Sequence, residues 1–346
     1  MLRVFSTFTG IGGFEIGIHN ATVGKANVEF VGYSEIDKYA IQVFDYWYKG
    51  VKNYGDITKI KASELPNFDC LVGGFPCQAF SIAGRRAGFN DTRGTLFFDL
   101  ARIMREKQPR LFVFENVKGL LSHDGGATFR TIIATIDELG YDCQWQVLNS
   151  KNYGVPQNRE RVVIVGHLRG TPRPQVFPLG GADSKDLITL NQARHDYDRV
   201  YASEGIAPAL NTGQRGNAQP KVIQRPRGKN SGGLHDIAPT LTGKSYQDNN
   251  HIISKTVRAG GRNSPHGSKQ NWDSYLVDGV IRRLTPLECE RLQGFPDNWT
   301  KFGVDQNDNI IQLSDTQRYK MCGNAVTTNV IQAVFEKLFD KRYGVI

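Results

Sequence analysis

The sequence predicts an α/β fold, in which a mostly parallel sheet carries helices on both faces, joined to a smaller, irregular β-rich part. Apolar strand-like runs alternate with amphipathic helical segments through the first half of the chain, which is typical of βαβ units. Composition changes near Gly170: from Thr171 to Asp278, glycine, proline, asparagine, serine and arginine replace long apolar runs. From Ile281 the pattern is again that of a compact fold.

Strands and helices are expected to alternate along the first half. The strand candidates are Arg3–Phe8, Val28–Ser34, Phe68–Gly73, Leu111–Glu115, Cys143–Asn149 and Arg161–His167. The helix candidates between them are Gly13–Asn20, Lys38–Trp47, Leu96–Glu106 and Thr128–Leu139. The helix that begins at Leu96 has the apolar spacing of an amphipathic helix.

A weak internal repeat predicts order in the glycine-rich part. Gly205–Gly213 resembles Asp236–Gly243, and each stretch is followed by an asparagine-rich turn and a short β run, 221–223 and 251–253. Units of about 30 residues with β turns favour a small irregular β domain. The alternative is a loop-rich insertion or a disordered segment.

Two helices are expected in the last part of the chain. Thr285 as N-cap, Pro286 at the first helical position and Glu288 three residues past the cap predict a helix start. A final helix is expected from about Ala325 to Tyr343.

The composition, the apolar run lengths and the net charge of the chain exclude several classes of protein. No apolar run approaches the roughly 20 residues that a membrane span needs, and the first residues do not have the pattern of a signal peptide. Five widely spaced cysteines predict neither a disulfide framework nor a zinc site, so we expect a cytoplasmic protein without a metal. The net charge of +9 favours a polyanionic partner, although many basic proteins bind no nucleic acid.

A cysteine at the end of an apolar run is the first candidate for chemistry. Cys77 follows the run Cys70–Gly74, and Glu115 ends the next apolar strand. Reactions in open α/β sheets usually take place at such carboxyl ends of strands. A thiolate and a carboxylate there could attack an electron-poor aromatic ring and hold its nitrogen edge. The alternative is an inert cysteine that packs as a small apolar side chain.

A glycine turn after the first strand is a candidate nucleotide site. Gly10, Gly12 and Gly13 open a helix, and glycines let a backbone approach a ligand closely. Their spacing differs from the G-x-G-x-x-G of dinucleotide enzymes. Glu35 and Asp56 follow later strands, where one carboxylate could bind ribose hydroxyls and the other an adenine amino group. We therefore favour a site for a nucleoside cofactor over the alternative, in which the two acidic side chains are simply solvated at the strand ends.

Two arginines, Arg159 and Arg161, begin a later strand and lie two residues apart, on one face of it. They could direct two guanidiniums into the site. They could equally form solvated pairs with Glu160, and the motif alone does not decide.

These motifs, in this order, resemble the DNA (cytosine-5)-methyltransferase family over residues 1–170 and 280–335. The motifs are Phe8–Phe14, Glu35, Asp56, Gly74–Gln78, Gly94–Phe98, Glu115–Val117, Gln157-x-Arg159-x-Arg161, Arg283–Pro296 and Gly323–Val326. The resemblance implies a Rossmann-like methyltransferase domain at 1–170 and a target-recognition domain at 171–279. It also implies that 280–346 returns to complete both, ending with the C-terminal helix.

The resemblance implies a methyl transfer from S-adenosylmethionine, which leaves S-adenosylhomocysteine, to carbon 5 of cytosine in duplex DNA. Cys77 would add to C6, Glu115 would hold N3 and the exocyclic amine, and Arg159 and Arg161 would orient the base. The implied cofactor residues are Phe8, Gly10, Gly12, Gly13, Glu35, Asp56, Ile57, Pro76, Leu96, Asn324 and Val326. Ile36 departs from the pattern, because some members carry an aromatic residue there that stacks on adenine.

The reaction requires the base to leave the stack, and the segment 79–94 resembles the covering lid. The DNA-contacting candidates are Ser81, Arg85, Arg86, Arg93, Arg215, Arg225, Arg227, Lys244, Arg258 and Arg262. We expect a bacterial or phage-encoded monomer, with a restriction endonuclease as a possible separate companion.

Two alternatives stay open at this point. Members of the family that act on transfer RNA share the catalytic motifs but usually carry a Cys-Phe-Thr signature, which is not found here. A catalytically inactive DNA-binding module would not need Cys77, Glu115 and both arginines. An NAD-dependent oxidoreductase is disfavoured by the glycine spacing.

Overall fold

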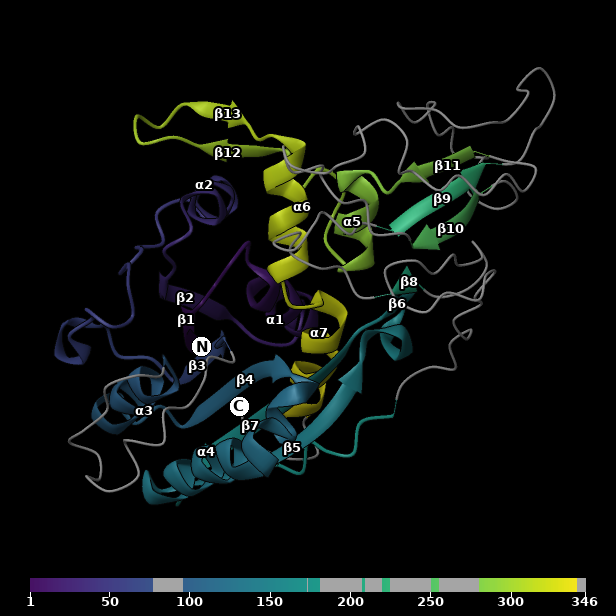
Figure 1. Cartoon of the computed structure of the whole chain (residues 1–346). Helices are drawn as coiled ribbons and strands as arrows, with labels where there is room; N and C mark the ends of the chain where they lie inside the picture. The colour runs from purple at the N-terminus through teal and green to yellow at the C-terminus, as the bar shows by residue number, and fades with distance from the viewer. Residues whose placement is uncertain are drawn as a thin grey trace.

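The computed structural model describes residues 1–76, 96–172, 174–180 and 284–340 with their side chains, and the backbone alone at 207–208, 220–224, 250–254 and 280–283. The helices are α1 (Gly13–Thr22), α2 (Lys38–Trp47), α3 (Leu96–Lys107), α4 (Ala127–Glu138), α5 (Pro286–Leu292), α6 (Asp315–Asn324) and α7 (Thr328–Leu338). Figure 1 shows their arrangement around the main sheet.

The main sheet has six strands in the order β2-β1-β3-β4-β7-β5. These are β1 (Leu2–Thr7), β2 (Val28–Ser34), β3 (Cys70–Gly74), β4 (Leu111–Val117), β5 (Tyr141–Asn149) and β7 (Glu160–Leu168). β7 alone runs antiparallel to its neighbours β4 and β5. The prediction of a mostly parallel sheet is therefore confirmed.

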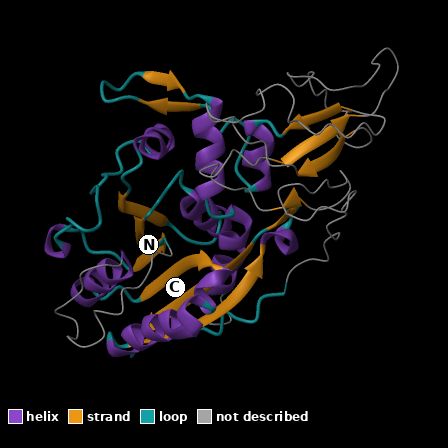
Figure 2. Cartoon of the chain, viewed as in Figure 1, coloured by secondary structure: helices purple, strands orange, loops and turns teal. Residues whose placement is uncertain are grey.

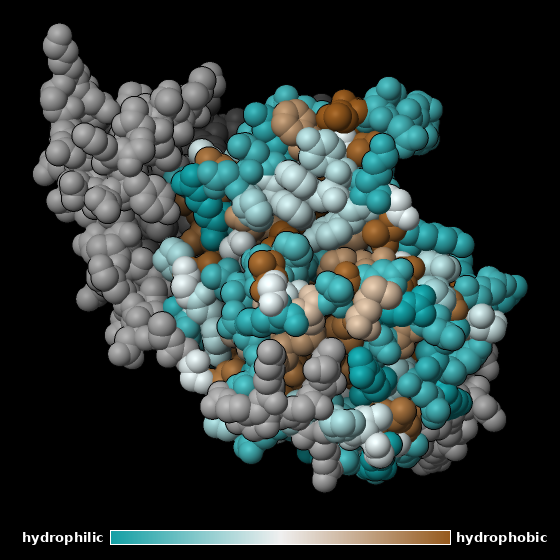
Figure 3. Space-filling model, turned by 180° about the vertical axis from the view of Figure 1, so that it is seen from behind, coloured by the Kyte–Doolittle hydropathy of each residue, from teal (hydrophilic) through white to brown (hydrophobic). Residues whose placement is uncertain are grey.

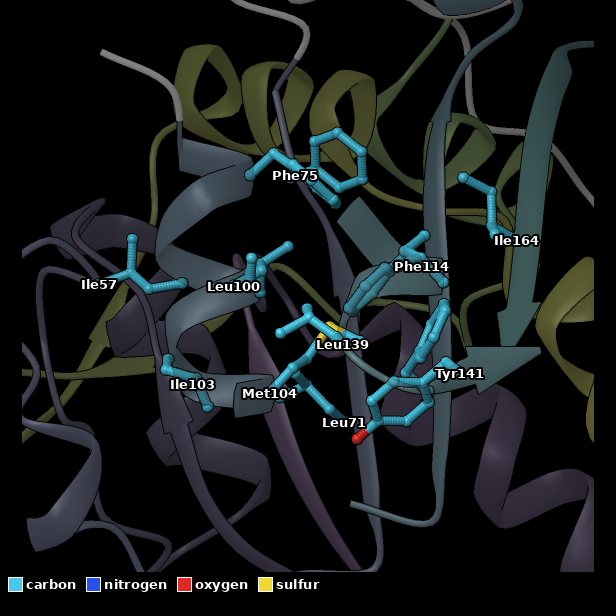
Figure 4. Close-up of a cluster of buried hydrophobic side chains, with 14 of the residues drawn as sticks. Ile57, Leu71, Phe75, Leu100, Ile103, Met104, Phe114, Leu139, Tyr141 and Ile164 are labelled. Atoms are coloured by element: carbon cyan, nitrogen blue, oxygen red, sulfur yellow. The ribbon is translucent and has the colours of Figure 1, made fainter. Parts of the chain in front are cut away.

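Helices cover both faces of this sheet, as expected (Figure 2). On one face, α1 and α7 pack on alternate strand residues such as Val4, Val72 and Val113. On the other face, α3 and α4 pack on the intervening residues, which include Phe5 and Phe112. Figure 4 shows part of this second cluster. The central strands β1, β3, β4 and β7 are thus largely buried on both sides, which explains their continuous apolar runs in the sequence.

The bounds of several elements match the predictions. The strand Val28–Ser34 and the helix Lys38–Trp47 have the expected limits, and the helix that starts at Pro286 carries the expected capping box. The final helix is shorter than predicted. It begins at Thr328 because Ala325 and Thr327 are extended, and it ends at Leu338. Helix α6 and the hairpin of β12 (Phe302–Val304) and β13 (Ile310–Gln312) were not anticipated.

The segment that carries the internal repeat contributes strands to a small antiparallel sheet beside the main one (Figure 1). Its central strand β9 (Pro220–Gln224) pairs with β10 (Asn250–Ser254) and with β11 (Val280–Arg283). The first two strands contain the two β runs that the repeat predicts. β6 (Gln157–Asn158) also pairs with β8 (Ala207–Pro208), so the insert meets the segment that leads into β7.

The last part of the chain is fixed to the first by aromatic rings. The rings of Trp299 and Trp47 stack with their centroids 4.3 Å apart. Each indole donates a hydrogen bond to a carbonyl: Trp299 to Ile11 at 2.8 Å, and Trp47 to Trp299 at 2.8 Å. Lys320 of α6 adds an ion pair of 2.6 Å with Asp37, the N-cap of α2.

The face seen in Figure 3 is mostly hydrophilic where it is described, with apolar residues scattered singly or in small groups. Among the described residues, no helix is both long and apolar enough to cross a membrane.

Candidate active site

The strand order places a topological switch point between β1 and β3. The chain runs from β1 outward to β2 and then crosses back to β3 on the other side of β1. Ligands of open α/β sheets bind in the crevice beyond the strand ends at such a point. The glycine turn follows β1, and Phe75 and Pro76 follow β3. The two motifs singled out in the sequence therefore follow neighbouring strands, one on each side of the switch point.

The turn between β1 and α1 is held in an uncommon backbone conformation. Phe8 has a φ of 50°, and Gly10 and Gly12 have φ values of 58° and 87°. A non-glycine residue at positive φ costs free energy, so strain of this kind is concentrated at functional sites. No atom lies within 4 Å of the position that a Cβ on Gly10 would occupy. A ligand could therefore approach this backbone closely.

Gly13 serves a different purpose, because its lack of a side chain admits Val326. A Cβ on Gly13 would lie 2.7 Å from Val326 Cγ1 and 2.8 Å from the Val326 carbonyl oxygen. The return of residues 323–326 to the glycine turn, which the resemblance implies, is thus a direct backbone contact. Asn324 is exposed, whereas its neighbours Gly323 and Ala325 are buried.

Glu35 ties the glycine turn to the end of β2. One carboxylate oxygen accepts a hydrogen bond from Gly10 N at 2.8 Å, and the other accepts from Ile36 N and Asp37 N. Asn53 braces this arrangement from the next segment, since its amide bonds both the N–H and the carbonyl of Glu35.

Asp56 follows directly on that braced segment. Hydrogen bonds from Thr58 lower the pKa of Asp56, so its carboxylate is charged at neutral pH. Both Glu35 and Asp56 are partly exposed at this edge of the sheet. Two carboxylates in series beside an open glycine turn fit the hydroxyl and amino groups of a nucleoside.

Glu115 lies at the end of β4, beside the end of β3. It pairs in register with Gly74, and its Oε2 would be 3.1 Å from a Cβ on that glycine. Arg161 Nε is 2.9 Å from Glu115 Oε1, and the two side chains are only 19% and 12% exposed. The carboxylate is therefore held beside Gly74, which precedes Cys77 by three residues in the sequence.

Asn116 holds the segment that leads to Cys77. Its buried amide donates a hydrogen bond of 2.8 Å to the carbonyl of Phe75. The Phe75 ring packs against Phe97 and Phe114 (Figure 4). The backbone that enters the cysteine segment is thus fixed by a hydrogen bond and by two ring contacts.

Arg159 does not share the environment of Arg161. It is 3% exposed, and its guanidinium donates hydrogen bonds to the carbonyls of Gly323 at 3.2 Å and Ala325 at 2.8 Å. Burial, together with the positive charge of Arg161, lowers the pKa of Arg159 to about 9, so it remains charged at neutral pH. Glu160 between them faces outward and pairs with exposed Lys118. The predicted pair of arginines on one strand face is thus divided between two partners.

The other expected site residues have varied positions. Ile57 is buried in the apolar cluster under α3, Leu96 begins α3 at the edge of that cluster, and Pro76 is exposed. Cys77 and the DNA-contacting candidates Ser81, Arg85, Arg86, Arg93, Arg215, Arg225, Arg227, Lys244, Arg258 and Arg262 lie outside the described residues. No group of residues suited to holding a metal ion is found in the described part of the chain.

Comparison with known proteins agrees with this geometry. The family model described as C-5 cytosine-specific DNA methylase matches residues 2–340. The chain belongs to this family of DNA methylases. Membership implies S-adenosylmethionine as the methyl donor and DNA as the substrate.

Curated relatives of this methylase include type II methyltransferases of bacteria and an orphan methyltransferase of Bacillus phage SPR. The chain is 36% identical over 344 residues to the type II methyltransferase M1.ScrFI of Lactococcus lactis subsp. cremoris, covering 98% of this chain and 78% of the relative. It is 35% identical over 354 residues to the type II methyltransferase M.HhaI of Haemophilus parahaemolyticus, covering 96% and 93%. A crystal structure of a DNMT2 variant from Spodoptera frugiperda has the same fold, with a TM-score of 0.63 at 16% identity over 98% of this chain and all of that one.

Four contributors to the candidate site have roles that were not anticipated from the sequence. Asn53 and Asn116 act through single amide hydrogen bonds, which no spacing rule reveals. The carbonyls of Gly323 and Ala325 are backbone groups, so residue type gives no signal for them.

Proposed function

We propose that Cys77 of this DNA (cytosine-5)-methyltransferase adds to C6 of a cytosine flipped out of duplex DNA, while Glu115 holds the N3 edge. The observation that carries the proposal is the ion pair of Glu115 with Arg161 beside Gly74, where β3 and β4 end. It supports a carboxylate that is fixed in position next to the segment that bears Cys77.

The other cysteines with described environments support Cys77 as the nucleophile. Cys70, Cys289 and Cys322 are fully buried, and burial raises the pKa of each thiol well above its ordinary value. Burial also raises the pKa of Cys143 to about 11. Since the thiolate is the nucleophile, these four cysteines stay protonated and unreactive at neutral pH.

The steps assigned to this chain follow from the chemistry of cytosine, whose C5 is a poor nucleophile. Addition of the Cys77 sulfur at C6 moves the ring electrons toward C5 while N3 takes up a proton. The Glu115 carboxylate accepts a hydrogen bond from this N–H and so stabilises the charge that develops; N3 gives the proton back at the end. The methyl donor, when bound, supplies an electrophilic carbon on a sulfonium sulfur. Loss of the C5 proton and departure of the Cys77 thiolate then restore the aromatic ring.

The residues around the glycine turn suit that donor. Glu35 would bind the ribose hydroxyls and Asp56 the adenine amino group, while Gly10 leaves room for close approach. Exposed Asn324 and half-buried Val326 would close the pocket from the return segment. The segment 171–279 would read the DNA sequence as the target-recognition domain. We further propose a cytoplasmic monomer, with any restriction endonuclease acting separately.

Methyl transfer with labelled donor tests the proposal. The protein should label duplex DNA at cytosine, and bisulfite sequencing of DNA from expressing cells should show one protected sequence context. Transfer RNA incubated in parallel should remain unlabelled. Label on transfer RNA alone would replace this function by RNA methylation, and no label on either would contradict the assignment.

A further inference from the structure

Residues 323–326 comprise the end of α6 and the start of its connection to α7, and are called the connection below. This connection is held on both sides of Asn324 by one side chain. Arg159 donates to the carbonyl of the residue before Asn324 and to that of the residue after it, at 3.2 and 2.8 Å. Arg159 comes from a segment more than 160 residues earlier in the chain. The guanidinium thus fixes the backbone from which the exposed side chain of Asn324 projects.

The opposite side of this connection lies against the glycine turn. Val326 contacts Gly13 so closely that no Cβ could be placed there without moving Val326. Residues 323–326 therefore lie between Arg159 and the turn that would cradle the methyl donor. Their position depends on both neighbours.

Further buried hydrogen bonds extend this link. Ser150 N donates to the carbonyl of Arg159 at 3.0 Å, and the hydroxyls of Ser150 and Thr327 are 2.8 Å apart. Thr327 in turn donates to the side chain of Gln293, whose amide donates to the carbonyl of Cys322, each at 2.8 Å. Ser150, Thr327 and Gln293 are all buried. Buried networks of this kind weaken as a whole when one member is lost.

The two arginines of the motif therefore serve different parts of the site. Arg161 is engaged with Glu115, whereas Arg159 is engaged with the connection that closes the donor pocket. We propose that Arg159 is a positioning residue for the donor pocket, acting through residues 323–326, whereas Arg161 serves the cytosine. This inference rests on the proposed function.

Two measurements on the full-length protein separate these roles. The first is the KM for S-adenosylmethionine. The second is the exchange of tritium from C5 of cytosine in duplex DNA without any donor. In that exchange Cys77 adds to C6, a proton from water adds to C5, and tritium leaves to solvent as the thiolate departs. It therefore reports on the base site alone.

Arg159→Met should raise the KM for the donor about tenfold or more, because two buried carbonyls lose their charged partner. Arg159→Lys should restore part of the affinity. The exchange rate should fall less than about threefold in both variants. Arg161→Met should instead lower the exchange rate strongly and leave the KM for the donor nearly unchanged. A drop in exchange with an unchanged KM in Arg159→Lys would overturn the inference.

Two further variants guard against misfolding. Thr327→Val removes the hydroxyl link to Ser150 with little change in shape. It should raise the KM for the donor, but by a smaller factor than Arg159→Met does.

Arg318→Lys is the matched control. Arg318 is the other buried arginine among the described residues, and it binds Glu290 and Thr300 instead of the connection. It should lower the melting temperature without the rise in KM. An equal rise in Arg318→Lys would reduce the role of Arg159 to general stability. Absence of both transfer and exchange in the unaltered protein would contradict the proposed function and this inference with it.

Discussion

Arg161 and Glu115 lie on adjoining antiparallel strands, with Arg161 Nε 2.9 Å from Glu115 Oε1. Arg161 pairs in register with Val117, two residues beyond Glu115, so the two charged residues are diagonal neighbours on one face of the sheet. Both are largely shielded from water. The strand register therefore sets the direction of the carboxylate, whose Oε2 lies beside Gly74.

Replacing this carboxylate should impair chemistry more than binding. Glu115→Gln keeps the shape but loses the negative charge that, in the proposed mechanism, stabilises the protonated N3 edge. We expect DNA affinity to stay within about threefold while the rate of methyl transfer falls about 100-fold or more. Single-turnover kinetics and a DNA-binding titration measure the two effects. Glu160→Gln is the matched control, because Glu160 forms only an exposed pair with Lys118 and should remain close to normal. Near-normal turnover in Glu115→Gln would remove Glu115 from the mechanism.

A methyl group at Gly13 should displace residues 323–326, which we propose to close the donor pocket. In Gly13→Ala the new Cβ would meet both a side-chain carbon and the carbonyl of Val326. Because the carbonyl belongs to the backbone, we expect a loss of about 1–3 kcal/mol in unfolding free energy and a weaker affinity for S-adenosylmethionine. Calorimetric titration of the donor checks this. Gly119→Ala, where an added Cβ has open space, should behave as the unaltered protein does. Equal donor affinity in both variants would contradict the packing argument.

Glu15 of α1 should make stability depend on pH. It is fully buried, and its oxygens accept no hydrogen bond within 3.5 Å from any described residue. Burial raises the pKa of Glu15 from 4.5 to about 7, although nearby Ser6 acts in the opposite direction. The folded chain therefore binds this proton more tightly than the unfolded chain does. The stabilisation is fully present below pH 4.5 and is lost as the pH rises through about 7.

Denaturant unfolding of Glu15→Gln at several pH values tests this dependence. The unaltered protein should lose on the order of 3 kcal/mol, relative to the variant, between about pH 4.5 and pH 8. Stability curves that run parallel across this range would show that Glu15 is not buried as a carboxyl in the folded protein.

Exchange of the segment 171–279 with that of a relative should change which DNA sequence is methylated. The small sheet of β9, β10 and β11 lies apart from the residues of the proposed catalytic site, so the chemistry should survive the exchange. Bisulfite sequencing of cellular DNA identifies the new context. An unchanged methylated sequence would place recognition in another part of the chain.

The alternation of apolar runs was sufficient to predict the main sheet and its helices, because strands buried on both faces have a continuous apolar pattern. The start of α5 was also predictable, since Thr285, Pro286 and Glu288 form a local capping box. Helix α6 escaped prediction because its sequence, from Asp315 to Asn324, is mostly polar and has no clear apolar stripe. The helix still forms, because buried Arg318 pairs with Glu290 far away in the sequence.

The sequence was sufficient to predict which residues belong to the candidate site, but not which groups these residues bind. Motif spacing marked Glu35, Glu115 and both arginines. It could not show that Arg159 binds the backbone of the return segment, because such a partner depends on the tertiary fold. The contributions of Asn53 and Asn116 were hidden for the same reason.

Trapping with 5-fluorocytosine is the most direct test of Cys77 as nucleophile. In duplex DNA with this base at the methylated position, fluorine replaces the C5 proton that must leave, so the thiolate cannot be expelled after methyl transfer. The protein should form a stable covalent complex that requires S-adenosylmethionine. Peptide mapping should place the base on Cys77, and Cys77→Ser should give no complex. A complex that persists in Cys77→Ser, or turnover on ordinary DNA without trapping on the fluorinated base, would contradict the account.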